Sequence, residues 1–154
     1  MRDWFIKCIA TGLLTGYSPT VAGTVGTIPA WAIAFFLIEG NQPILIAAAV
    51  VTFFISVWAA GRAEPLFGHD SKKIVIDEWA GMFVSLLFVP YSLTNYLIAF
   101  VAFRVFDVLK IPPAAQAERL RSGWGVTMDD IVAGIQANLL TQVIILTIGF
   151  FRQQ

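Results

Sequence analysis

Charge is scarce in this sequence. Only 13% of its 154 residues are Asp, Glu, Lys or Arg, and the formal net charge is +0. Soluble domains carry about 25%. The high apolar share excludes a disordered chain, and the neutral balance excludes a nucleic-acid binder that relies on basic charge. A single cysteine, Cys8, excludes a disulfide scaffold.

Apolar residues take the place of the missing charge. They make up 58% of the chain and give it a mean hydropathy of +0.77. A soluble domain of this length has too much surface to bury so many of them. The composition therefore predicts a small integral membrane protein. Because no repeat, linker or low-complexity stretch divides residues 1–154, we expect one domain.

The apolar runs predict an all-α, polytopic membrane bundle with about four to five crossings. A crossing needs about 20 helical residues, and the expected crossings are 20–38, 43–60, 74–89, 93–110 and 131–151. Residues 1–17 lack the pattern of a secretory signal, and we expect them to form an amphipathic helix at the membrane surface, anchored by Trp4. Most cations then share one side, which the positive-inside rule makes cytoplasmic.

The acidic residues gather at the predicted cytoplasmic ends of these crossings. Six of the ten lie in three short segments, and these six are Asp70, Asp77, Glu78, Asp107, Asp129 and Asp130. Acidic residues within a membrane bundle are costly and normally face its interior with a partner. For each segment taken alone, helix capping or a simple ion pair is an alternative explanation.

Two cations and a small-residue segment accompany the acids. Lys110 follows Asp107 by three residues and Arg104 precedes it by three, so one helical face carries all three. Residues 18–27 are rich in Gly, Ser and Thr. Such a segment can bring backbone N–H groups close to an oxyanion, although close helix packing explains it better when it is taken alone.

This set of side chains suits phosphate chemistry. Clustered carboxylates without several His or Cys partners favour a hard divalent ion, Mg²⁺ above all, and nearby cations add anion binding. A phosphohistidine route with a second histidine as acid or base is excluded, because His69 is the only one. A cysteine phosphatase is excluded because no Arg follows Cys8 at the required spacing.

Taken together and in order, these segments resemble the bacterial phosphatidylglycerophosphatase A family of Mg²⁺-dependent membrane enzymes. The matching residues are 23–27, His69-Asp70, Asp77-Glu78 with Gly81, 103–107 with Lys110, 123–125 with Asp129-Asp130, and Ala133-Gly134. Two departures concern the local backbone. Ile111 stands between Lys110 and Pro112, and Ala22 stands where the family often has a proline.

The resemblance implies removal of the terminal phosphate of phosphatidylglycerophosphate, a membrane phospholipid, at the cytoplasmic face of the bacterial inner membrane. It implies that the metal ligands are Asp77, Glu78, Asp107, Asp129 and Asp130. The substrate-binding residues would be Thr24, Gly26, Thr27, Asp70 and Arg104. The catalytic residues would be Asp77, Lys110, Asp130 and His69.

Other functions remain open at this point. A phosphatase for another lipid phosphate, such as phosphatidic acid, would use the same residues. A small transporter or proton relay would use intramembrane carboxylates but would spread them across the bilayer, whereas a phosphatase gathers them at one face. A passive lipid-binding subunit would not need the acids for turnover. The choice of base, the number of metal ions, a covalent aspartyl-phosphate route and the oligomeric state also stay open.

Overall fold

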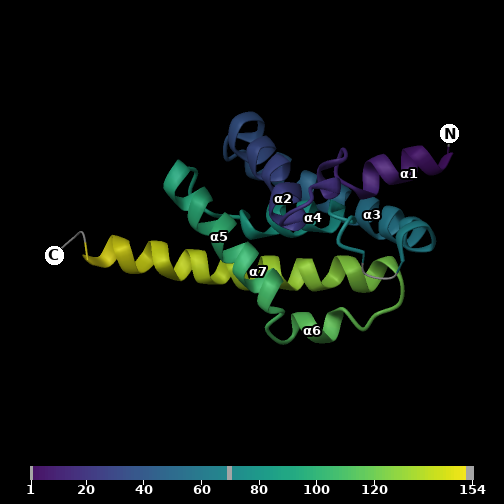
Figure 1. Ribbon diagram of the computed structural model, residues 1–154. Helices are drawn as coiled ribbons and strands as arrows, with labels where there is room; N and C mark the ends of the chain where they lie inside the picture. Colours follow the sequence, from purple (N-terminus) through teal and green to yellow (C-terminus); the bar gives the residue numbers. More distant parts are fainter. Residues whose placement is uncertain (1, 69–70, 152–154) are drawn as a thin grey trace.

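The computed structural model describes residues 2–68 and 71–151, and these residues form helices without any strand (Figure 1). The elements are α1 (Arg2–Ala10), the short helix η1 (Thr15–Tyr17), α2 (Ala22–Ile33), its π-helical continuation η2 (Ala34–Ile38), α3 (Gln42–Phe67), α4 (Ile76–Ser85), α5 (Leu93–Leu109), α6 (Ala114–Ala117) and α7 (Gly123–Phe151). The all-α prediction is confirmed.

Among the described residues, two helices are long and apolar enough to cross a membrane, α3 with 26 residues and α7 with 29. At about 1.5 Å per residue, each exceeds the roughly 30 Å of hydrocarbon in a bilayer. They contain the runs predicted at 43–60 and 131–151. Large apolar side chains are exposed on both, among them Phe54 and Leu146. Exposed apolar faces of this size are expected where lipid surrounds a protein.

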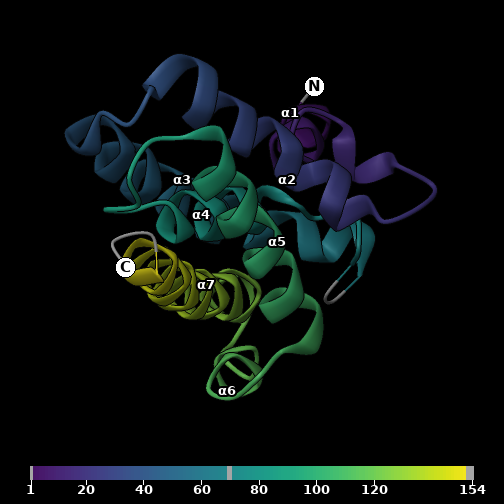
Figure 2. The ribbon, with the colours of Figure 1, turned by 90° about the vertical axis from the view of Figure 1, so that its left-hand side faces the viewer.

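The shorter helix α4 forms the centre of the bundle. Nine of its ten residues are buried, and it packs against α2, α3 and α7. Viewed nearly along α7, α4 lies between α7 and α2, whereas α6 lies on the other side of α7 (Figure 2). Close approach to α7 depends on two glycines. A side chain at Gly134 would collide with the carbonyl of Gly81, and a Cβ at Gly81 would lie 2.6 Å from the carbonyl oxygen of Asp130.

Two turns meet at the end of the bundle where α3 and α5 begin. The side chain of Gln42 accepts a 2.9 Å hydrogen bond from the backbone of Phe88, and the hydroxyl of Tyr91 donates to the backbone of η2 at 2.9 Å. The side chains of Asn41 and Ser92 cap the first turns of α3 and α5, respectively. Turns 39–42 and 90–92 therefore lie at the same end of the bundle.

The N-terminal segment is shorter as a helix than predicted. α1 ends at Ala10, and η1 follows within the expected 1–17 span. Ile6 and Ala10 are buried and α1 packs against α3, whereas Trp4 is 67% exposed. An exposed Trp agrees with a membrane-surface anchor, and that location stays a prediction.

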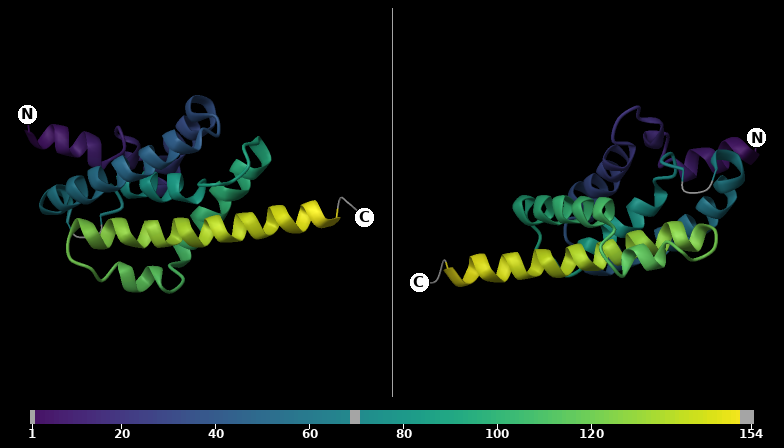
Figure 3. Two further views of the ribbon diagram at one scale, coloured as in Figure 1. Left: turned by 180° about the vertical axis from the view of Figure 1, so that it is seen from behind. Right: turned by 60° about the horizontal axis from the view of Figure 1, so that its bottom comes forward.

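Helices α5 and α7 cross, and the crossing separates two environments. The C-terminal end of α7 extends beyond the other helices (Figures 1 and 3). The opposite end of α7 lies beside α4, α6 and the end of α5. The surroundings of the C-terminal end of α7 are apolar, and the opposite end holds the polar side chains of the candidate site.

Candidate active site

One pocket of about 580 Å³ collects most of the residues predicted for the site. Eight of the twelve line it, and they are Thr24, Asp77, Glu78, Arg104, Asp107, Lys110, Asp129 and Asp130. They come from four places that are distant in sequence: the beginning of α2, the first turn of α4, the end of α5 and the second turn of α7. The carboxylates are therefore clustered at one end of the bundle rather than spread along it.

Burial distinguishes the carboxylates from ordinary helix caps. Asp77, Glu78, Asp129 and Asp130 are at most 8% exposed. Asp77 and Glu78 lie in the first turn of α4, where the helix dipole favours negative charge. However, Asp77 Oδ1 and Glu78 Oε2 are buried without a hydrogen-bond partner among the described residues. A capping role leaves these two oxygens unexplained, because buried polar atoms normally have partners.

Arg104 joins α5 to α2 and α4. Its Nη1 lies 2.7 Å from Asp107 Oδ2 and 3.6 Å from Glu78 Oε1, and it donates to Thr27 Oγ1 at 3.3 Å. The guanidinium thus bridges two of the predicted ligands. Its Nε is buried without a partner among the described residues and remains available to an acceptor.

Lys110 joins the end of α5 to α7. It adopts a left-handed backbone conformation, with φ of 46°, and ends the helix. Its Nζ lies 3.0 Å from Asp129 Oδ2 and 2.5 Å from Glu118 Oε1. A left-handed conformation is unfavourable for a residue with a side chain and is often found at functional sites. The ammonium group is held between two carboxylates from different segments.

The described wall of the pocket carries more acidic than basic side chains. Five carboxylates face three cations, because Lys72 joins Arg104 and Lys110 in the lining. Like charges repel strongly where water is excluded, so ionisation of all five carboxylates, which leaves an excess of two negative charges, requires a bound cation. As they stand, no three Asp, Glu, His or Cys side chains of the described residues converge as ligands around one point.

Comparison with known proteins identifies the family. The family model for phosphatidylglycerophosphatase A matches residues 8–145. The chain belongs to the phosphatidylglycerophosphatase A family. It is 33% identical to phosphatidylglycerophosphatase A of Escherichia coli over 82% of this chain and 76% of that protein. It is 31% identical to the Haemophilus influenzae protein of the same name over 86% of this chain and 83% of that one.

A third relative carries a different name. The chain is 35% identical, over 92% of its length and 94% of the other protein, to a Bacteroides thetaiotaomicron protein named "Putative phosphatidylinositol-3-phosphatase". No solved structure gives a significant match. The relatives therefore agree on lipid phosphates as the substrate class while their names differ in the head group.

Two residues of the small-residue segment lie behind the pocket rather than in its lining. The carbonyl of Gly26 accepts a 2.8 Å hydrogen bond from Trp79 of α4, and Thr27 is fully buried. Thr27 Oγ1 donates to the carbonyl of Gly23 at 2.8 Å and accepts from Arg104. In this phosphatidylglycerophosphatase A family member, Gly26 packs α2 against α4 and Thr27 orients Arg104. His69 and Asp70 lie outside the described residues.

Three further residues belong to the site by their geometry. Gly23 lines the pocket, and a Cβ there would collide with the carboxylate of Glu78 and approach Arg104 Nη2 to 2.6 Å. Lys72 lines the pocket, and Glu118 contacts Lys110 from outside it. The paired lysines after His69 gave a weak signal for Lys72. Glu118 gave none, because it follows Lys110 by eight residues across a proline turn rather than along one helix.

Proposed function

We propose that the protein hydrolyses the terminal phosphate monoester of phosphatidylglycerophosphate to phosphatidylglycerol and inorganic phosphate. The observation that carries the proposal is the meeting of five carboxylates, three cations and the beginning of α2 in one pocket. A transporter or proton relay would distribute its acids along the pathway, so the clustering favours the phosphatase. The family membership supports the same reaction.

The cations and α2 would bind the phosphate group. Arg104 and Lys110 would donate to the phosphoryl oxygens as negative charge develops on them. The first backbone N–H groups of a helix have no partners within the helix, and α2 begins at Ala22 in the pocket wall. Thr24 lies in the same turn and would add its hydroxyl. Substrate would replace some of the present contacts of Arg104 with Asp107.

The carboxylates would hold Mg²⁺, and the pocket's chemistry fits such an ion. The two unpartnered oxygens of Asp77 and Glu78 are hard ligands, and the excess of two negative charges matches one divalent cation. The ligand set would be Asp77, Glu78, Asp107, Asp129 and Asp130. When bound, Mg²⁺ would neutralise phosphoryl charge and lower the pKa of a water molecule.

One of two carboxylates would take part in proton transfer as well. Asp77 or Asp130 would accept the proton of the attacking water, because both are buried in the pocket and removed from bulk solvent. The water oxygen would bond to phosphorus as the P–O bond to the glycerol oxygen breaks, and the glycerol oxygen would take up a proton. His69 remains our prediction for this donor, and Asp70 for head-group binding.

We further propose five passes through the bacterial inner membrane, with the pocket at the cytoplasmic face. The passes would be α2 with η2, α3, residues 74–89, α5 and α7. This order supports the pocket location, because α2 and α7 begin at the pocket end and α3 and α5 finish there. The lysines at 72, 73 and 110 lie at that end, as the positive-inside rule expects. α1 would rest on the membrane surface.

A phosphate-release assay tests the proposal. Purified protein in detergent is given phosphatidylglycerophosphate, phosphatidic acid and phosphatidylinositol 3-phosphate, each with Mg²⁺ and with a chelator. We expect the fastest release from phosphatidylglycerophosphate and loss of release with the chelator. Phosphatidylinositol 3-phosphate is the second candidate because of the Bacteroides relative's name. Release from none of these lipids would contradict the phosphatase, and equal release with chelator would contradict Mg²⁺.

A further inference from the structure

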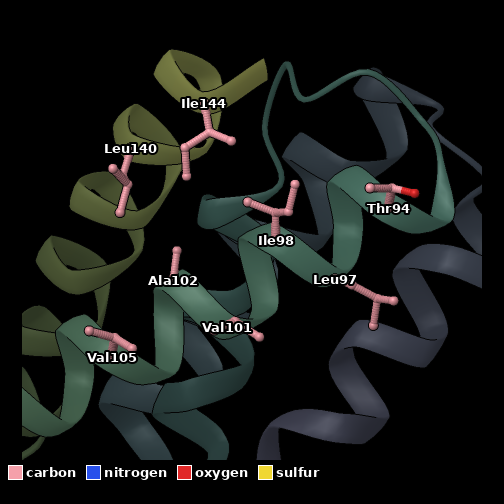
Figure 4. Close-up of a pocket in the computed structure, with 8 residues that line it drawn as sticks. All are labelled: Thr94, Leu97, Ile98, Val101, Ala102, Val105, Leu140 and Ile144. Carbon is pink, nitrogen blue, oxygen red and sulfur yellow. The ribbon is translucent and has the colours of Figure 1, made fainter. Parts of the chain in front are cut away.

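An apolar groove of about 480 Å³ lies between α5 and α7, outside the charged pocket. Seven of its eight lining residues are Ala, Val, Leu or Ile, and Thr94 stands at one end (Figure 4). Ile98 and Val105 line it from α5, and Leu140 and Ile144 from α7. Ala102, a small residue, lies between them on α5. The groove has the volume and the lining of a site for an apolar ligand.

The same two helices carry the groove and the charged pocket. On α5, Val105 lines the groove, and Val108, three residues later, lines the pocket. On α7, Leu140 follows the pocket residue Asp129 by eleven residues, which returns to within about 20° of the same face. Eleven residues of helix extend about 16 Å. The groove therefore continues from the pocket end of these helices toward the opposite end of the bundle.

We propose that this groove holds one acyl chain of the lipid whose phosphate occupies the charged pocket. The inference rests on the proposed function, because it takes the substrate to be a phospholipid. When the head group lies among the carboxylates and cations of the pocket, the acyl chain extends along α5 and α7 through the groove, away from the pocket end. The lining matches a hydrocarbon chain and offers nothing to a polar occupant beyond the hydroxyl of Thr94.

The groove contributes orientation rather than affinity. Lipid tails surrounding the protein are as apolar as its leucines, so moving a chain from the bilayer into the groove yields little free energy. A chain held along α5 and α7 nevertheless fixes the depth and angle of the phosphate, and reaction rates depend steeply on such positioning. Filling the groove should therefore lower the rate for a lipid and spare a substrate without acyl chains.

A matched pair of variants tests the assignment. Leu140→Trp fills the groove, whereas Leu146→Trp adds the same bulk to the same helix at a residue that is 72% exposed and lies outside the groove. The substrates are long-chain phosphatidylglycerophosphate and its deacylated head group. We expect kcat/KM for the lipid to fall about tenfold in Leu140→Trp and less than about twofold in Leu146→Trp, with the head group unaffected in both. Equal effects of the two variants on the lipid would overturn the proposal.

A labelling experiment separates this inference from the proposed function. Phosphatidylglycerophosphate with a photoreactive diazirine on one acyl chain is irradiated with the protein in phosphatidylcholine vesicles, and labelled peptides are located by mass spectrometry. We expect labelling at residues 97–105 and 140–144 that exceeds labelling elsewhere on α7 and decreases in Leu140→Trp. Uniform labelling of exposed apolar faces would overturn the groove even if phosphate is released. Groove labelling without phosphate release would instead contradict the phosphatase alone. Ile98→Trp, which fills the groove from α5, replaces Leu140→Trp if the latter does not fold.

Discussion

The first half of α7 buries charged residues, whereas its second half exposes large apolar residues. Between Gly123 and Ala137 the buried residues include Asp129 and Asp130. Beyond Thr141 the helix exposes Val143, Leu146 and other large apolar side chains. A soluble protein would arrange these residues the other way round. This arrangement agrees with a membrane protein whose buried charge is gathered at the pocket and whose exposed apolar side chains face lipid.

The charged half depends on close packing that the apolar half does not need. Glycines at 81 and 134 let α4 and α7 approach until backbone atoms touch, which brings Asp77 and Asp130 to one pocket. Gly149, in the apolar half, has nothing within 4 Å of the place where a Cβ would stand. Substitutions in the two halves should therefore have effects that differ in kind as well as in size.

Removing one buried carboxylate should have the largest effect. Asp77→Asn keeps the size of the side chain but removes its charge and one hard ligand, so we expect phosphate release to fall about 10³-fold or more. Thermal unfolding without added metal should be unchanged or slightly higher, because a repulsive charge is lost. Phosphate release and unfolding temperature are measured in parallel.

The matched control for Asp77→Asn is Glu39→Gln, at the exposed turn before α3. It removes a negative charge far from the pocket and should keep full activity. Full activity in Asp77→Asn would remove that residue from the site. A loss of activity accompanied by unfolding would assign it a structural role instead.

A methyl group at Gly23 should have the next largest effect. Its Cβ would displace Glu78 and Arg104, and misplacement of such groups by about 1 Å can cost about 100-fold in rate. Gly23→Ala is compared with Gly149→Ala, in which the methyl group meets nothing within 4 Å. The control should keep its activity and gain up to about 1 kcal/mol in stability, since Ala is the better helix former. Equal activity of the two variants would contradict the tight contact.

The sequence predicted the charged residues better than their surroundings. Asp77, Asp107 and Asp130 were identifiable because an acidic residue in a nearly uncharged, apolar membrane segment is costly and usually has a functional role. The small-residue segment was ambiguous, because Gly and Thr serve anion binding and helix packing equally well. The structure divides it, with Thr24 in the pocket wall and Thr27 behind Arg104. Local composition carries no signal for that division, because it depends on which face of α2 meets α4.

Helix lengths were also only partly predictable. The apolar run at 74–89 reads as one crossing, yet its helix α4 ends at Ser85 and turns follow. Asn138 of α7 donates to the carbonyls of Ser85 and Leu87 at 3.0 and 2.6 Å, which stabilises this early end. A contact between residues more than fifty positions apart has no signature in the local sequence.

Loosening Lys110 should reduce activity by a smaller factor. Glu118→Gln weakens the 2.5 Å contact that holds the ammonium group, while the contact with Asp129 remains. We expect kcat to fall about tenfold with KM nearly unchanged, and Glu118→Asp to recover part of the loss. Arg119→Gln, at the exposed neighbouring residue, is the control. A change in KM alone would make Glu118 part of substrate binding.

The smallest effect is expected at a buried polar pair that takes no part in the pocket. Ser56 of α3 and Thr127 of α7 share a 2.7 Å hydrogen bond between their hydroxyls. Ser56→Ala leaves Thr127 without this partner and should cost about 0.6 kcal/mol, the average for such bonds in membrane bundles. Ser56→Ala with Thr127→Val should recover part of that cost, because neither hydroxyl is then left unpaired. Unfolding in detergent measures both variants, and phosphate release should stay at the wild-type rate. A loss of activity in the double variant would mean that this buried pair contributes to the pocket. It would contradict the view that packing and the pocket are separate.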